Sequence, residues 1–103
     1  MHFPAELMAL PAFAGGAFEA RQLRAAGCDV LFASYPAGQA IAAHRHDTHN
    51  VGLLTRGELC LRQRGEERRF ATGEWYRVET GVEHAARFER DTSIIEFWFG
   101  AAS

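Results

Sequence analysis

The sequence predicts an all-β domain built from short antiparallel strands. Four glycines recur every eight residues, at Gly57, Gly65, Gly73 and Gly81. Turn residues at such a spacing, between β-rich runs, are typical of an antiparallel sandwich or barrel. No long stretch repeats apolar residues with the 3.6-residue period of a helix. Because 103 residues leave room for one hydrophobic core, we expect a single domain over residues 1–103.

The expected elements follow from the turn signals. Residues 1–16 contain Pro4, Pro11 and a glycine pair, which predict a loosely structured N-terminal arm with at most a helical turn between Glu6 and Leu10. The arm is followed by β-rich runs separated by turn residues. We expect strands at residues 18–24, 29–35, 50–55, 58–63, 68–70, 74–78, 84–88 and 93–99.

The last expected strand is apolar on both faces apart from Glu96. Alternation divides its apolar residues into two sets. The set that we expect in the core consists of Ile95, Phe97 and Phe99. Ile94 and Trp98 then line a ligand pocket or belong to a covered outer sheet. A second subunit is the simplest cover, since monomers rarely expose large apolar patches, so we expect a homodimer.

Composition and charge exclude several classes of function. The net charge is −2, with 48% hydrophobic and 23% charged residues, which predicts a globular protein without affinity for nucleic acid or anionic membranes. All eleven basic residues are arginine, typical of a GC-rich bacterial genome, and this excludes a lysine Schiff base. Cys28 and Cys60 form no C-x-x-C pair, so we expect buried free thiols. No signal peptide or transmembrane run is evident, and we expect a cytoplasmic protein.

Three of the five histidines lie within six residues, at His44, His46 and His49. In a β-strand the side chains of His44 and His46 would point the same way. Neutral imidazole nitrogens are good ligands for zinc, iron, copper and nickel. The sequence therefore predicts a metal pocket.

The spacing of histidines and glycines resembles the two signature motifs of the cupin superfamily. The first family motif is glycine, five residues, H-x-H, three or four residues, glutamate, six residues, glycine. The second is glycine, five residues, P-x-G, two residues, histidine, three residues, asparagine. The matching positions are Gly38, His44, His46, Asn50 and Gly57 in residues 38–57, and Gly73, Gly81 and His84 in residues 73–88. The resemblance covers about half of the chain and implies a small jelly-roll β-barrel of antiparallel strands.

The chain departs from the motifs at three positions. Asn50 replaces the family's glutamate, Glu79 its proline and Phe88 its closing asparagine. The glycines and the strand pattern still support the fold. Metal binding is weakened, because an amide oxygen is a weaker, neutral ligand.

The resemblance implies that His44, His46 and His84 are metal ligands, with Asn50 in the fourth position. A water molecule could take that position instead, or His49 if the turn before it directs its side chain inward. Alternation counted from His46 favours Asn50 inside and His49 outside, although a turn resets the count. Three neutral imidazoles suit a divalent transition metal (Fe, Zn, Ni, Cu or Mn), which would polarise a bound oxygen or, as iron, bind dioxygen.

Few other residues near this site could take part in catalysis. Glu96 is the candidate catalytic acid or base, since burial would raise the pKa of its carboxyl toward neutrality; alternatively, it pairs with an arginine on the outer sheet. Arg77 either binds an anionic substrate or faces water. The candidate walls of the substrate pocket, each of which could instead be core, are Trp75, Tyr76, Phe88 and Trp98.

Three functions are compatible with these residues. The first is a metal-dependent enzyme of dioxygenase, isomerase or lyase type that acts on a small organic molecule. The second is a non-catalytic module that binds or senses a small ligand with a weak or empty metal site. The third is a storage or structural cupin whose site is vestigial. The position of Glu96 discriminates between the first two, because acid–base catalysis requires it to face the pocket.

Overall fold

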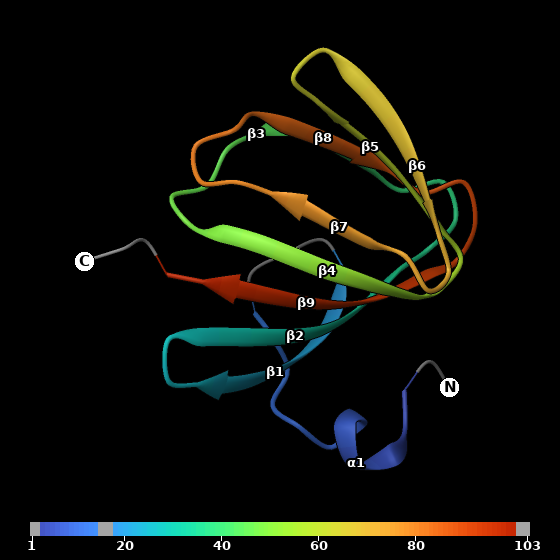
Figure 1. Cartoon of the computed structure of the whole chain (residues 1–103). Coiled ribbons are helices and arrows are strands. Elements are labelled where there is room, and N and C mark those ends of the chain that lie inside the picture. The colour runs from blue at the N-terminus through green and yellow to red at the C-terminus, as the bar shows by residue number, and fades with distance from the viewer. Residues whose placement is uncertain (1–2, 15–17, 101–103) are drawn as a thin grey trace.

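The computed structural model describes residues 3–14 and 18–100, and it consists of two antiparallel sheets packed face to face (Figure 1). The larger sheet has the order β1 (Glu19–Ala25), β2 (Cys28–Tyr35), β9 (Thr92–Phe99), β4 (His49–Arg56) and β7 (Trp75–Val78). The smaller sheet has the order β3 (Ala40–His44), β8 (His84–Arg87), β5 (Glu58–Gln63) and β6 (Glu66–Ala71). The all-β prediction is confirmed, and the two sheets form a jelly-roll sandwich rather than a closed barrel.

The periodic glycines mark turns, as predicted. All four have positive φ angles, between 77° and 91°. In the β5–β6 hairpin, Arg64 (φ 53°) and Gly65 (φ 77°) form the two-residue loop. Two consecutive positive φ angles define the type I′ turn, whose twist matches that of the flanking strands.

The expected strands agree with eight observed strands to within two residues at each end. The ninth, β3, was not predicted. Its sequence is rich in alanine, which is depleted in strands, and Ile41 is its only β-branched residue. The N-terminal arm contains a single helical turn, α1 (Ala5–Met8), close to the expected position.

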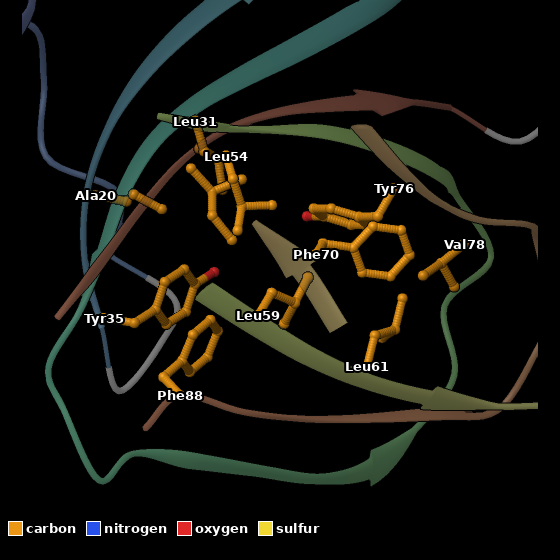
Figure 2. Close-up of a cluster of buried hydrophobic side chains, with 12 residues drawn as sticks. Ala20, Leu31, Tyr35, Leu54, Leu59, Leu61, Phe70, Tyr76, Val78 and Phe88 are labelled. Carbon is orange, nitrogen blue, oxygen red and sulfur yellow. The ribbon is translucent and has the colours of Figure 1, made fainter. Parts of the chain in front are cut away.

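The main hydrophobic core lies between the two sheets. Figure 2 shows side chains from both sheets that meet in this layer. The rings of Tyr35 and Phe88 stack at 4.2 Å, and Phe70 meets Tyr76 edge-on at 6.1 Å. The buried members of this core are Ala20, Leu31, Ala33, Tyr35, Leu54, Leu59, Leu61, Phe70, Tyr76, Val78, Phe88 and Ile94.

A second cluster covers the outer face of the larger sheet. Phe3, Leu7 and Met8 of the N-terminal arm pack there against apolar residues of β2 and β9. Ile95 and Phe97 belong to this outer cluster. On the opposite face of β9, Ile94 and Glu96 are 1% and 2% exposed and line the space between the sheets.

The predicted orientation of the last strand is therefore wrong. The set Ile95, Phe97 and Phe99 faces outward, and Phe99 is 41% exposed. Both sets on this strand are apolar, so alternation separates the two faces without saying which one meets the other sheet.

Two further sequence predictions concern the cysteines and the membrane. Cys28 and Cys60 are both free thiols, as expected; Cys60 is buried, whereas Cys28 is only half-buried. Within residues 3–14 and 18–100, no helix has the length and apolar character needed to span a membrane.

Candidate metal centre and cavity

A cavity of about 800 Å³ lies between the two sheets. The strand register of the larger sheet arranges its lining in rows, because alternate residues of every strand point inward. One row contains Asp29, Trp98, Asn50 and Val78. The next row contains Leu31, Glu96, Gly52 and Tyr76. Asn50 and Glu96 are both almost completely buried and lie on adjacent rows of one cavity wall.

Three histidines converge beside the first row. His44 ends β3 and lies opposite His84, the first residue of β8, while His46 follows β3 in the connecting loop. The ring centroids are 4.3–4.9 Å apart. One nitrogen from each ring lies within 4.8 Å of the others. Only His44 lies on the strand, because β3 ends at this residue. His46 reaches the same point through the loop that follows and not, as predicted, by the alternation of side chains along a strand.

Hydrogen bonds to the backbone fix two of the three imidazole tautomers. His44 Nδ1 lies 2.8 Å from the Ala42 carbonyl, and His84 Nδ1 lies 3.0 Å from the Val82 carbonyl. A carbonyl oxygen only accepts, so each Nδ1 must donate its hydrogen. The neutral ring then presents a lone pair at Nε2, the arrangement that orients histidine ligands in metal sites.

Burial favours the neutral form of the histidines. It is the main cause that lowers the pKa values of His46 and His84, and the neighbouring imidazoles lower them further. At neutral pH these two rings are therefore uncharged and available as ligands.

The spacing of the nitrogens fits a shared ion. His44 Nε2 and His46 Nε2 are 3.0 Å apart. Two nitrogens each about 2.1 Å from one metal would be separated by about 3.0 Å at a right angle and by about 3.4 Å at the tetrahedral angle, so the observed separation is close to that of two ligands of one ion. This donor set of imidazole nitrogens suits a divalent transition metal.

The two candidates for a fourth ligand lie on opposite faces of β4. Asn50 faces the cavity, where its Nδ2 donates to the Phe97 carbonyl at 3.3 Å and leaves Oδ1 available. His49 faces outward, and its Nε2 accepts from Arg77 Nη1 at 3.0 Å. Because this contact occupies the His49 lone pair, Asn50 is the better placed of the two.

Glu96 is held by two donors on its own wall of the cavity. The Tyr35 hydroxyl donates to Oε2, and the indole Nε1 of Trp98 donates to Oε1 at 3.1 Å. Burial raises the pKa of the Glu96 carboxyl to about 7, although both hydrogen bonds act in the opposite direction. Trp98 also touches His46 edge-on at 4.8 Å, so its indole ring lies between the carboxyl and the histidines.

Gly52 makes room for Tyr76 beside this carboxyl. A Cβ atom at position 52 would lie 2.3 Å from Tyr76 Cε1 and 2.6 Å from its hydroxyl oxygen. In Figure 2 the hydroxyl groups of Tyr35 and Tyr76 both point toward the middle of the interior. The Glu96 charge raises the pKa of each hydroxyl further beyond the effect of burial, which is consistent with both rings lying near the carboxyl.

Comparison with known families agrees with this architecture. A family model described as "Cupin domain" matches residues 31–99, more than half of the chain. The chain belongs to the cupin family. No curated protein matches its sequence.

Solved structures show the same fold at low sequence identity. An RmlC-like cupin from Shewanella frigidimarina has a TM-score of 0.80 and 18% identity, covering 100% of this cupin and 94% of its own chain. KdgF from a Halomonas species has a TM-score of 0.74 and 15% identity; the match covers 89% of this cupin and 86% of the KdgF chain. A conserved protein of unknown function from Streptococcus pyogenes has a TM-score of 0.75 and 17% identity; the match covers 84% of this cupin and 76% of the Streptococcus chain. At these identities the likeness concerns the fold alone.

Three of the four predicted pocket walls line the cavity of this cupin: Tyr76, Phe88 and Trp98. Trp75 does not, because it faces the outer side of β7, is 54% exposed and packs against Phe97 at 6.0 Å. Arg77 lies on the same outer side, in contact with His49. The predicted placement of Trp75 in the pocket is therefore corrected, as is the suggested contact of Arg77 with a substrate there.

Tyr35 and Gly52 were not predicted as residues of the site. Tyr35 is inward by simple alternation with Leu31 on β2, but its role depends on a partner 61 residues away in the chain. A glycine inside a strand often marks the close approach of another group, and that signal was available for Gly52.

Proposed function

We propose that this cupin is a metal-dependent enzyme, of dioxygenase or isomerase type, that acts on a small organic molecule held between its sheets. The observation that carries the proposal is the convergence of three imidazoles at a cavity that also contains a buried, titrating carboxyl group. Largely preformed apolar cavities with a few convergent polar groups are the usual form of small-molecule sites.

His44, His46 and His84 would hold the metal ion through their Nε2 atoms, with Asn50 Oδ1 or the substrate in a further position. A bound divalent transition metal would supply a Lewis-acidic centre and, as iron, a redox-active one. Because no carboxylate is among these ligands, the ion would keep its full positive charge toward the substrate.

Glu96 would move the proton in this reaction. A pKa of about 7 leaves the carboxyl partly protonated at neutral pH, the condition under which it donates and accepts protons equally well. Tyr35 and Trp98 would hold the carboxyl in place, since each donates a hydrogen bond to one of its oxygens.

The outer face of the larger sheet supports the expectation of a homodimer. Trp75 and Phe99 are 54% and 41% exposed on adjoining parts of this face, and Phe97 is only partly covered by the arm. A second copy of the chain would remove this apolar surface from water.

A non-catalytic, ligand-binding cupin is the second candidate. It is favoured by the neutral Asn50 in the ligand position and by the fact that both oxygens of Glu96 already accept hydrogen bonds within the protein. In that case the cavity would bind its ligand without transforming it.

Turnover by metal-loaded protein distinguishes the two candidates. We would load the chain with Zn(II), or anaerobically with Fe(II), incubate it with a panel of small alcohols, phenols and ketones, and follow product by mass spectrometry and, for iron, oxygen uptake. His84→Ala should abolish turnover, and Glu96→Gln should lower it by roughly 100-fold or more. The matched controls are His49→Ala and Glu79→Gln, which alter a histidine and a glutamate outside the cavity. Both variants should retain the turnover of the unmodified chain. If panel members bind but no metal-dependent turnover occurs, the proposal of an enzyme is contradicted and the proposal of a non-catalytic ligand-binding cupin is supported.

A further inference from the structure

The cavity of this cupin contains no arginine. All eleven basic residues of the chain are arginines, all of them lie in the part that the structure describes, and none lines the cavity. Several are instead engaged in ion pairs on the surface. Arg64 pairs with Glu79 at 2.7 Å, and Arg87 pairs with Glu67 at 2.6 Å.

The ionisable acids that line the cavity would repel an anion. Asp29 and Glu96 both belong to its wall, on adjacent rows of the larger sheet. Away from the three histidines, a carboxylate or phosphate on the body of a ligand would lose its hydration without gaining a cationic partner. Burying a charge without a partner is costly.

Most of the remaining lining is apolar or neutral. The apolar part includes Phe13, Phe18, Leu59, Leu61, Phe88 and Ile94. Gln22, Thr48 and Asn50 add neutral polar groups. The Tyr76 hydroxyl lies in the same row as Glu96 and is a donor or acceptor that a ligand hydroxyl or carbonyl could meet.

We propose that the ligand of this cavity is an uncharged, mainly apolar molecule with a hydroxyl or carbonyl group, and that the cavity selects against carboxylates and phosphates on the ligand body. This inference rests on the proposed function, because it concerns the same cavity. It names the class of substrate, and it also holds if the cavity only binds its ligand.

Three phenols that share one head group and differ in charge test the inference. The uncharged probe is 4-ethylphenol, the anion is 3-(4-hydroxyphenyl)propanoate and the cation is tyramine. Binding of each to the full chain, stripped of metal with a chelator, would be measured by isothermal titration calorimetry at pH 7. We expect 4-ethylphenol to bind about tenfold or more tightly than the propanoate, because the cavity offers no partner for the charge. Tyramine should also bind more tightly than the propanoate.

Two variants link this selectivity to the cavity. Gln22→Arg places a guanidinium on a half-buried lining position of the edge strand β1 and should raise the affinity for the propanoate relative to 4-ethylphenol. The matched control Arg77→Gln removes an arginine from the outer face and should leave the ratio unchanged. Equal or tighter binding of the propanoate by the unmodified chain would overturn the inference, as would a failure of 4-ethylphenol to bind.

A zinc titration of the same stripped sample separates this inference from the proposed function. If zinc does not bind while the preference for 4-ethylphenol holds, the metal-dependent enzyme is contradicted and the ligand class stands. If zinc binds and the propanoate is preferred, the metal site stands and the ligand class is overturned.

Discussion

The two polar groups of the cavity differ in how their hydrogen-bonding capacity is used. At the histidines, the backbone occupies Nδ1 of His44 and His84 and leaves their Nε2 lone pairs for another partner. One nitrogen from each of the three rings lies within 4.8 Å of the others. At Glu96, one row deeper in the sheet, protein donors occupy both carboxyl oxygens. A metal ion could therefore be added to the first group, whereas the second has no carboxyl oxygen left without a donor.

This difference separates binding from proton transfer. Lone pairs that face one another repel unless a proton or a metal ion lies between them, so the histidine group gains most from an added ion. The Glu96 group gains nothing from an ion, but its burial holds the carboxyl pKa near neutrality. Trp98 touches both groups and is the direct contact between them.

The largest effect that should distinguish Glu96 from the histidines is on the pH dependence of the free energy of unfolding. The folded pKa of Glu96 is about 7, above its ordinary 4.5. Between these values the unfolded chain releases a proton that the folded chain keeps, so the free energy of unfolding falls as pH rises, by about 3 kcal/mol in total. His46 and His84 act in the opposite direction, because their pKa values are lowered in the folded chain. As pH falls below the ordinary 6.5, the unfolded chain takes up protons that the folded chain does not, so the free energy of unfolding decreases.

Comparing Glu96→Gln with the unmodified chain isolates the carboxyl contribution. Relative to the unmodified chain, the variant should gain about 3 kcal/mol of stability between pH 4.5 and pH 7, because it lacks the titrating group while the histidines are common to both. Urea unfolding of metal-free protein across this range measures the difference. A difference that stays constant with pH would show that Glu96 titrates normally.

A smaller effect is expected from Gly52→Ala. The added Cβ would lie 2.3 Å from a Tyr76 ring carbon, and overpacking of this kind costs about 1–3 kcal/mol. The matched control is Gly100→Ala, since a Cβ there meets no atom within 4 Å. Chemical denaturation of both variants provides the measurement; equal stability of the two would mean that Tyr76 does not lie against Gly52.

The smallest effect is expected from Tyr35→Phe, which removes one donor to Glu96 and keeps the ring. The loss should be about 1 kcal/mol, and the Glu96 pKa should rise further, because that hydrogen bond lowers it. Tyr76→Phe is the control, since the described structure shows no hydrogen bond from its hydroxyl to Glu96. Titration of Glu96 by NMR would reveal the shift, and identical values in both variants would contradict the assigned bond.

Much of the fold could be predicted from local signals. Periodic glycines mark the turns, and five of the eight predicted strands contain β-branched or aromatic residues within their observed bounds. The other three, β1, β5 and β8, were located by the turn residues around them. β3 is rich in alanine, has a single β-branched residue (Ile41) and was missed. The faces of β9 were assigned the wrong way round, because a strand that is apolar on both sides contains no information about which side the second sheet covers.

For the candidate site, the motif spacing located the histidines but not their surroundings. His44, His46 and His84 come together because β3 and β8 pair, a contact between residues 40 positions apart. Trp98 lies two residues from Glu96 on the same strand, so alternation places both on one face. Neither the Tyr35 donor, 61 residues away in the chain, nor the outward position of Trp75 has a local sequence signature. Both depend on the sheet order, which places β9 between β2 and β4.

Metal binding by the histidine group tests the central claim most directly. We would titrate untagged, metal-free protein with Zn(II), and anaerobically with Fe(II), measuring bound metal by elemental analysis and the melting temperature in parallel. The account predicts about one ion per chain and a rise in melting temperature of about 10–20 °C at a hundredfold excess over Kd. Both should be lost in His84→Ala and retained in His49→Ala. A chain that stays empty with both metals, or a His84→Ala variant that binds as well as the unmodified protein, would contradict it.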